Sequence, residues 1–417
     1  MNKQYSINSP TELTAFAVCA NGLEDSLLSE LKTFHGLKCI KKNKGGISFR
    51  TKPELICKLN LWARIPSRIL IQLGKTQIKN ADELLNFAQR IVWEQWFTPL
   101  NSFRIDVNST GKMPISISAN YAALKFKDGI CDRFRSKFNN TRPNVDTKNP
   151  EIRIWIHFVN SLVTVSIDTS GEPLFKRGWR NSRGIAPIKE NLVSGLLSMT
   201  NWNMIQPLLD PMCGSGTFVI EAMQKSAKLP ANFLPSRTRR FACENFSDES
   251  PFKNVKWNVL REEALDVWES KHKISDIPII MGMDIDTEMI DIAKKNSFVA
   301  LPEKIANSII WQIADFSNIN ENTRINFSPG ILVTNPPFGS RFELDRSSKQ
   351  KFIEKIGTNL KKNFPGWTAW ILTDEKKFSS LVRLRHKKKF SVFNGDIPCN
   401  WLSFEMVAGT MKKKDEI

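Results

Sequence analysis

The sequence predicts an α/β protein in which an N-terminal α+β region precedes a doubly wound α/β domain. From residue 191 onward, short apolar runs alternate with helical stretches, which is typical of a parallel sheet covered by helices. Two strands with alternating apolar residues close the N-terminal region at 152–158 and 162–167. A polar, arginine-rich stretch at 176–184 separates the two regions.

The N-terminal region contains two groups of elements, with a division expected between residues 54 and 55. Apolar spacing in the first group predicts a strand at 14–18, a helix at 23–31 and a strand at 46–49. The second group, residues 55–166, has expected helices at 55–61, 81–91 and 120–138, and strands at 67–73, 102–107, 152–158 and 162–167.

The C-terminal region, residues 191–417, is expected to contain parallel strands joined by helices, after a junction at 167–190. Apolar runs predict strands at 205–209, 278–283, 309–313, 330–334 and 368–373. Residues 390–407 hold two more strand-like runs around Asn394-Gly395, a pair that favours a tight hairpin turn. The segment 225–275 has no clear pattern.

The chain is strongly basic, with 60 Lys and Arg against 42 Asp and Glu and a net charge of +18. Residues 1–170 carry 24 basic and 14 acidic residues, so both regions share the excess. This balance favours a polyanionic partner, since Lys and Arg that neutralise phosphates release counterions. A basic surface that only aids solubility is the alternative.

Cysteine and histidine usage argues against a metal site. The seven cysteines include no Cys-x-x-Cys pair, and there are only four histidines. We therefore expect no bound metal, and reduced thiols in a cytoplasmic protein. No apolar run is long enough to cross a bilayer, and the first residues lack the apolar segment of a signal peptide, so no membrane partner is expected.

The motif Asn335-Pro336-Pro337-Phe338 ends the apolar run 330–334. Two prolines stop the strand and stiffen the turn, because each lacks a backbone donor and has a fixed φ. The Asn335 amide and the Pro336 carbonyl would then form two acceptors at the strand end, beside the ring of Phe338. A planar exocyclic amine fits such a receptor. The alternative is an ordinary proline-rich loop.

Residues 208–222 predict a strand, a glycine turn and a helix, with Asp210 at the strand end. Gly214 and Gly216 allow positive φ and close approach of the backbone to a ligand. The following helix would offer free N–H groups and a positive dipole end to an anion. The loop lacks the Gly-Lys-Ser/Thr of a Walker loop, and its spacing differs from the dinucleotide fingerprint Gly-x-Gly-x-x-Gly.

These two motifs together resemble those of amino-methyltransferases that use S-adenosylmethionine (SAM). Further ordered matches narrow the resemblance to the THUMP-domain RNA guanine-N2 methyltransferases, and within them to the N-terminal module of the RlmL group, which acts on 23S ribosomal RNA. The matches are Gly22-Leu23-Glu24, Lys127–Ile130, Arg142–Asp146, Asp168–Gly171, Lys176–Arg180, Ala186–Glu190, Gly282–Asp284 and Asn394-Gly395. Many relatives read Asn-Pro-Pro-Tyr-Gly-Glu-Arg, where this chain has Phe338 and Ser340.

The resemblance implies a domain order for the whole chain. Residues 1–54 would form a ferredoxin-like subdomain and 55–166 a THUMP RNA-binding domain. After the junction at 167–190, residues 191–417 would form a Rossmann-like SAM-dependent methyltransferase domain.

The resemblance also implies which residues bind SAM at the strand ends, where open α/β sheets hold ligands. The methionine part would contact Asp210, Cys213, Gly214 and Gly216. Thr217 and Asn335 are two further cofactor-binding residues that the resemblance implies. Asp284 would accept hydrogen bonds from the ribose hydroxyls, or else cap a helix. Asp315 would accept from the adenine amine with Phe316 against the ring, or else be a loop aspartate. Cys213 has no base close in sequence, which favours a loop-filling thiol over a nucleophile.

The implied reaction is methyl transfer to guanine N2, with Asn335, Pro336 and Phe338 as catalytic residues. A tRNA guanine-N2 enzyme, an adenine-N6 or glutamine-amide methyltransferase, and a non-catalytic RNA-binding assembly factor are the alternatives. The expected partner is ribosomal RNA, free or in a precursor particle. One candidate RNA contact is the basic tract 383–389. The others are Lys127, Arg177, Arg180 and Arg183, and for each of these four the alternative is a solvated surface residue.

Overall fold

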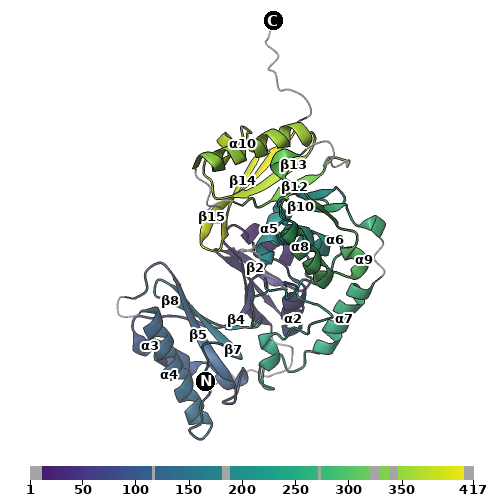
Figure 1. Ribbon diagram of the computed structural model, residues 1–417. Coiled ribbons are helices and arrows are strands. Elements are labelled where there is room, and N and C mark those ends of the chain that lie inside the picture. Colours follow the sequence, from purple (N-terminus) through teal and green to yellow (C-terminus); the bar gives the residue numbers. More distant parts are fainter. Residues whose placement is uncertain are drawn as a thin grey trace. The chain divides into compact units, whose positions relative to one another are not determined.

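The computed structural model describes residues 12–114, 118–180, 188–270, 274–319, 328–337 and 346–407, with only the backbone of Ile274 and Arg346. The chain divides into two compact units. Unit 1 comprises the residues up to Cys19 together with 28–174 and 239–261. Unit 2 comprises 20–27, 175–238 and the chain from 262 onward. Each unit is built on one sheet (Figure 1).

Unit 1 contains an eight-stranded sheet in the order β2-β3-β1-β4-β8-β7-β5-β6. Its strands are β1 (Leu13–Val18), β2 (Lys38–Asn43), β3 (Gly46–Thr51), β4 (Arg68–Gln77), β5 (Ser102–Thr110), β6 (Asn144–Val145), β7 (Ile152–Val159) and β8 (Leu162–Asp168). β4 pairs with both β1 and β8, so one sheet continues across the predicted division at residues 54 and 55. That division stays a prediction.

Helices cover one face of this sheet. They are α2 (Pro53–Trp62), α3 (Ala81–Arg90) and α4 (Ala119–Lys137), while α1 (Glu24–Leu31) crosses from unit 2 into unit 1. The alternation in β7 explains the two faces: Ile152, Ile154 and Ile156 are fully buried, whereas Arg153 and Trp155 are half-buried on the other side. α3 and α4 pack together over the part of the sheet formed by β5 and β7 (Figure 1).

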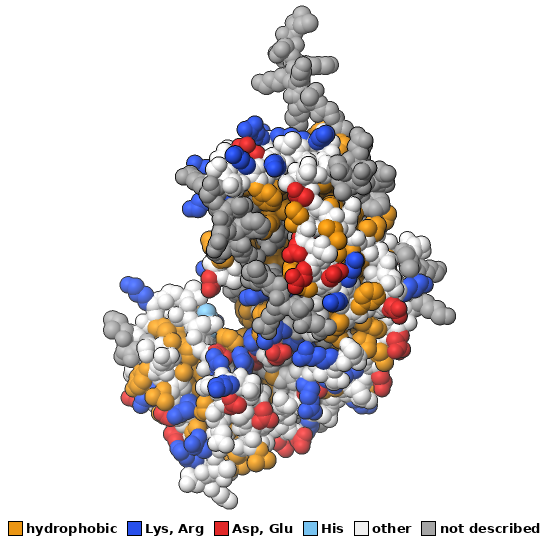
Figure 2. All heavy atoms as spheres, viewed as in Figure 1, with side chains coloured by type: hydrophobic (Ala, Val, Ile, Leu, Met, Phe, Trp, Pro, Cys, Tyr) orange, Lys and Arg blue, Asp and Glu red, His pale blue; other side chains and the backbone are white. Residues whose placement is uncertain are grey.

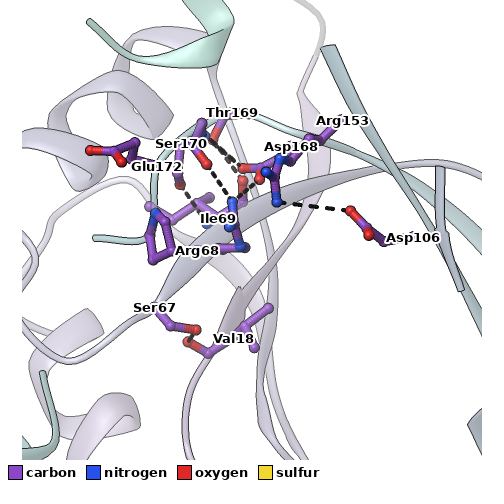
Figure 3. Close-up of polar contacts among 12 residues, drawn as sticks. Val18, Ser67, Arg68, Ile69, Asp106, Arg153, Asp168, Thr169, Ser170 and Glu172 are labelled. Carbon is purple, nitrogen blue, oxygen red and sulfur yellow. Dashed lines mark hydrogen bonds and ion pairs between the residues drawn. The ribbon is translucent and has the colours of Figure 1, made fainter. Parts of the chain in front are cut away.

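A buried ion pair joins the start of β4 to the end of β8 (Figure 3). Arg68 donates to the fully buried Asp168, whose Oδ1 accepts from the Ser170 amide at 2.8 Å. Ser170 Oγ accepts in turn from the Ile69 amide at 2.9 Å. Burial raises the pKa of Asp168, and the positive charge of Arg68 opposes that rise. The network therefore fixes the path of the chain as it leaves β8.

Unit 2 contains a seven-stranded sheet in the order β11-β10-β9-β12-β13-β15-β14. Its strands are β9 (Leu208–Asp210), β10 (Ile280–Asp284), β11 (Ile310–Ile313), β12 (Ile331–Thr334), β13 (Thr368–Thr373), β14 (Lys388–Asn394) and β15 (Ile397–Glu405). The strands from β9 to β13 are parallel, and β15 and β14 add an antiparallel hairpin. The parallel strands and the hairpin at Asn394-Gly395 confirm the predicted fold class.

The strand order of unit 2 reverses at β9, which lies between β10 and β12. In open parallel sheets, ligands bind beyond the carboxyl ends of the strands at such a reversal. The helix α5 (Glu190–Met199) precedes β9. The helices between the strands are α6 (Thr217–Ser226), α8 (Thr287–Ala300), α9 (Glu303–Ala306), α10 (Arg346–Asn363) and α11 (Phe378–Leu381), while α7 (Trp257–Glu269) begins in unit 1 and ends in unit 2.

The sequence order of the chain does not follow the division into units. The segment 20–27 belongs to unit 2, where a Cβ on Gly195 would meet the Leu23 side chain at 2.7 Å. Ser26 Oγ also donates to the Gly195 carbonyl at 3.3 Å. Conversely, residues 239–261 belong to unit 1, where the Ser247 amide donates to the Trp96 carbonyl at 2.9 Å.

Candidate cofactor and catalytic site

A cavity of about 580 Å³ lies at the carboxyl ends of β9, β10 and β12 in unit 2. Sites for drug-sized ligands and cofactors span roughly 300–1,000 Å³. The cavity lies at β9, where the strand order of the sheet reverses. Its lining residues include Ile188, Asp210, Met212, Cys213, Gly214, Ser215, Thr217, Asp284, Ile285, Asp286, Met289, Asp315, Phe316, Asn335, Pro337 and Phe352.

Asp210 forms the buried floor of the cavity at the end of β9. Its side chain is almost fully enclosed, and its Oδ1 accepts from the Met212 amide at 3.2 Å. Burial raises the pKa of Asp210 to about 8; the Met212 amide and the nearby Thr334 hydroxyl oppose the rise, and the Asp284 charge adds to it. A cationic ligand group beside this carboxyl would favour its ionised form.

The glycine loop after Asp210 has two glycines with different roles. Gly214 has a φ of +51°, and a Cβ built on it meets nothing within 4 Å, so the backbone is open toward a ligand. Gly216 has a φ of +84° and does not line the cavity. Its Cβ would meet Ala293 and Trp311 at 3.0 Å. Gly216 therefore turns the chain into α6 and allows close packing, and its predicted contact with the cofactor stays a prediction.

Cys213 lies in the same loop as a buried thiol. Its amide donates to the Met283 carbonyl at 2.8 Å, which ties the loop to β10. Burial raises the pKa of the Cys213 thiol well above its ordinary value, and the charges of Asp210 and Asp284 raise it further. A nucleophilic cysteine needs the opposite shift. Cys213 is therefore a wall residue and not a nucleophile.

Asp284 at the end of β10 holds the glycine loop in place. Its Oδ2 accepts from the Gly214 amide at 2.8 Å, and its Oδ1 accepts from the Asp286 amide at 3.0 Å. The cap of α8 is Asp286, whose Oδ1 accepts from the Glu288 amide. The helix-cap alternative for Asp284 is therefore wrong, and its carboxylate lies on the cavity wall.

Asp315 follows β11 and begins a short 3₁₀ turn. Its carboxylate accepts from the Ser317 amide at 2.7 Å and from the Ser317 hydroxyl at 2.8 Å. Phe316 lines the cavity but is only 3% exposed, and its ring packs against Phe364 in the core. Asp315 is thus a turn residue that also lies on the cavity wall, and its predicted hydrogen bond with the adenine amine stays a prediction.

The proline motif reaches the cavity through two of its residues. Asn335 and Pro337 line the cavity directly after β12, while Pro336 is buried and does not line it. Phe338 and Ser340 lie outside the described residues. The structure thus brings Asn335, Asp210 and Asp284 to one cavity from three neighbouring strands.

Sequence reasoning missed several apolar wall residues and Ser215. Ile285 directly follows Asp284 and is 67% exposed, which is unusual for an isoleucine beside a buried strand. An apolar residue directly after a strand-end aspartate was a usable signal for an apolar wall of the cavity. Ile188, Met289 and Phe352 come from three different segments, and only the fold brings them together.

Two of the predicted RNA contacts are wrong, because their side chains are buried and hold internal partners. The Arg177 side chain is 0% exposed and pairs with Glu221 at 3.3 Å. Arg180 pairs with Glu190 at 2.6 Å and is only 15% exposed. Lys127 is half-buried and pairs with Asp128 at 2.8 Å, and Arg183 lies outside the described residues. The roles of Lys127 and Arg183 stay predictions.

Exposed basic side chains gather on α10 and in the tract that follows α11 (Figure 2). Two of these side chains have acidic partners: Lys387 pairs with Glu405 at 2.5 Å, and Arg383 with Glu354 at 3.6 Å. We call this surface the basic patch; its exposed members are Lys351, Lys355, Lys361, Lys362, Arg383, Arg385, Lys387, Lys388 and Lys389.

In the part of the chain that the structure describes, no three His, Cys, Asp or Glu side chains gather in a way that could hold a metal ion. No described helix is both long enough and apolar enough to cross a membrane. None of the seven cysteines, all of which lie in the described residues, forms a disulfide.

Comparison with known protein families identifies the domains. Residues 177–403, more than half of the chain, match the family described as the RMKL-like methyltransferase domain. The chain belongs to this family. Two further matches cover the N-terminal part: an RlmL ferredoxin-like domain over residues 14–70 and a THUMP domain over residues 79–168. The protein is therefore a THUMP-containing, RlmL-like methyltransferase.

Individual relatives agree with this assignment. A protein of Synechocystis sp. that carries the name of an RNA methyltransferase is 33% identical over 95% of this chain and 98% of its own length. A Shewanella protein (strain ANA-3) named ribosomal RNA large subunit methyltransferase K/L is 33% identical over 96% of this chain. The present chain spans about half, 54%, of the length of that second protein.

A solved structure connects the fold to the cofactor. The methyltransferase SMU.472, solved with S-adenosylhomocysteine (SAH), is 26% identical, has a TM-score of 0.80 and covers 96% of this chain and 99% of its own. The methyltransferase described here uses SAM. Its cavity suits that cofactor, because Asp210 and Asp284 are acceptors for cationic and hydroxyl groups, Gly214 leaves backbone space, and Ile285 and Met289 offer apolar surface to a base.

Proposed function

We propose that this methyltransferase transfers the methyl group of SAM to the exocyclic N2 of a guanine in 23S ribosomal RNA. The observation that carries the proposal is the position of Asn335, which lines the cofactor cavity directly after β12 and beside the end of β9. Support for the RNA comes from the THUMP match, the net charge of +18 and the ribosomal RNA enzymes among the relatives.

The residues of the proline motif would hold the amine rather than deprotonate it. The N2 lone pair of guanine is delocalised into the ring, so the amine is a weak nucleophile. Asn335 Oδ1 and the Pro336 carbonyl would accept its two hydrogens and favour the pyramidal geometry of the transition state. Alignment of this kind can lower a barrier by roughly 7–11 kcal/mol. When bound, SAM supplies an electrophilic methyl group, and the products are SAH, N2-methylguanine and a proton.

The base must leave its helix to reach the cavity, since an amine inside a duplex is not accessible to the methyl group. Phe338 would stack on the extruded base. The basic patch, with Lys127 and Arg183, would hold the surrounding RNA through phosphate contacts. We place the enzyme in the cytoplasm, where it would meet its ribosomal substrate.

Adenine N6 is the second candidate acceptor, because two acceptors and an aromatic ring can hold any planar exocyclic amine. A guanine-N2 and an adenine-N6 enzyme would differ in the modified nucleoside they produce. The test is an in vitro reaction with SAM labelled in its methyl group and unmodified ribosomal RNA, followed by nucleoside chromatography. We expect the label in N2-methylguanosine. Label in N6-methyladenosine alone would replace the proposal with the second candidate.

A further inference from the structure

Arg180 lies beside the cavity and makes four hydrogen bonds, and it has no place in the chemistry described above. Its guanidinium uses donors on all three nitrogens. Nε donates to Glu190 Oε1 at 2.6 Å, and Nη2 donates to the Ile188 carbonyl at 3.0 Å. Arg180 also lies over the ring of Trp179, with 4.7 Å from Cζ to the ring centroid. The guanidinium is therefore fixed from several sides.

The remaining two hydrogen bonds of Arg180 reach the glycine loop and the start of α6. Nη1 donates to Ser215 Oγ at 3.0 Å, and Nη2 donates to Thr217 Oγ1 at 2.9 Å. Both hydroxyl residues line the cavity, and they are only 6% and 3% exposed. Arg180 thus stands behind the cavity wall and touches it through two hydroxyl groups.

The direction of these hydrogen bonds decides what the hydroxyls can do. A guanidinium has no acceptor, so Ser215 Oγ and Thr217 Oγ1 must accept from it. Each hydroxyl keeps its own hydrogen to donate elsewhere. Within the described residues neither hydroxyl donates to a protein acceptor. Two buried O–H donors, polarised by a cation behind them, are thereby left for a ligand in the cavity.

The same wall carries further donors. α6 begins at Thr217, and its cap residue Gly216 supplies no side-chain acceptor, so the first N–H groups of the helix are not capped by a side chain. Elsewhere the cavity is lined by the carboxyl groups of Asp210 and Asp284. The cavity is therefore polarised, with donors on one wall and acceptors on another. This polarity suits a zwitterionic α-amino acid group.

We propose that Arg180 is a positioning residue that orients the Ser215 and Thr217 hydroxyls as a donor pair for the α-carboxylate of the SAM methionine portion. Glu190 holds the guanidinium in the required plane. Arg180 reaches Glu190, Ser215 and Thr217 from three different nitrogens, and the single nitrogen of a lysine cannot reproduce that spread. The inference concerns cofactor recognition and does not depend on which RNA base is methylated.

The test compares two ligands that differ only in the carboxylate. Calorimetry measures the binding of SAH and of its decarboxylated analogue, which keeps the adenosine, the sulfur and the amine. Arg180→Lys should weaken SAH binding at least tenfold and leave the analogue within about twofold, since charge-assisted hydrogen bonds to the carboxylate are lost. The Ser215→Ala/Thr217→Ala double variant should show the same selectivity, and it provides the test if Arg180→Lys does not fold.

Arg177→Lys is the matched control, because Arg177 is a second buried arginine of unit 2 that pairs with Glu221 and does not line the cavity. It should change the affinities for the two ligands by the same factor. Equal losses for both ligands in Arg180→Lys would show that Arg180 only supports the loop. SAH affinity within twofold of the parent in the double hydroxyl variant would also overturn the proposal.

Discussion

Asp210 is a buried carboxyl group whose pKa lies far from its ordinary value. Its carboxyl is buried at the cavity floor, and its pKa is raised from 3.8 to about 8 mainly by burial. A pKa of about 8 favours the protonated carboxyl in the ligand-free protein at neutral pH. A cationic cofactor would shift it toward the carboxylate, so its charge depends on occupancy of the cavity.

The stability of the ligand-free protein should consequently depend on pH through Asp210. Because its folded pKa exceeds its unfolded pKa, the stabilising contribution is complete below about pH 4 and is lost as the pH rises through about 8. If the folded protein retains one proton that the unfolded chain loses, the free energy of unfolding falls by up to about 1.4 kcal/mol per pH unit. Asp210→Asn should flatten the decline of the unfolding midpoint between pH 5 and 7.5. An identical pH dependence in the variant and the parent would contradict this reading.

Asn335 should act on the rate of methyl transfer and not on cofactor binding. If its amide oxygen holds the amine mainly in the transition state, Asn335→Ala should lower kcat by about 100-fold. SAM and RNA affinities should stay within a few-fold of the parent. Asn363→Ala, which removes a half-buried asparagine amide on α10 of the same unit, is the control and should keep parental turnover. Near-parental turnover in Asn335→Ala would remove Asn335 from catalysis.

The regular elements show which features can be predicted from sequence. The strands β7, β8, β10, β12 and β13 were predicted within a few residues, because buried apolar residues identify them. β11 was predicted from its apolar run 309–313, although Ile310 and Ile313 are exposed. β2 was missed, because this edge strand is exposed and lysine-rich, with little apolar patterning.

Arg177 and Arg180 were misassigned for a related reason. An arginine-rich stretch looks like a solvated surface until the partners of each charge, here Glu221 and Glu190, are known.

The glycine loop between β9 and α6 can be tested as a cofactor contact, with Gly395 of the same chain as the control for Gly214. Gly214 and Gly395 both have positive φ, +51° and +66°, and neither has atoms within 4 Å of a built Cβ. Gly214→Val and Gly395→Val should each cost about 1–2 kcal/mol or more of backbone strain. Only Gly214→Val should also weaken SAH binding, measured by calorimetry, because only Gly214 lines the cavity. Undiminished binding by Gly214→Val would refute the loop assignment.

The two units of the chain are interleaved in sequence. Unit 2 includes residues 20–27, which pack on α5 through Leu23 and Gly195, and unit 1 includes residues 239–261. A fragment beginning at residue 171 would therefore lack part of its own core. Point variants of the full chain are better suited to separating RNA recognition from cofactor binding.

The basic patch should contribute to RNA binding through phosphates. Lys351 and Lys355 are exposed on α10, and Lys294 and Lys295 are exposed on α8, so two double Lys→Glu variants change the net charge equally. The α10 variant should bind RNA more weakly than the parent. The slope of the logarithm of the RNA association constant against the logarithm of salt concentration should also become shallower by about 1–2 units. The α8 variant should stay near the parent. Equal effects of the two variants would show that net charge alone governs binding.

The claim that the protein methylates guanine N2 in 23S ribosomal RNA is tested most directly in the cell. Modified nucleosides of 23S ribosomal RNA are compared by mass spectrometry between the parent strain, a deletion strain and deletion strains that express either the parent chain or Asn335→Ala. We predict that one N2-methylguanosine disappears on deletion, returns with the parent chain and stays absent with Asn335→Ala. Unchanged N2-methylguanosine in the deletion strain, with a different methylated nucleoside lost, would contradict the account.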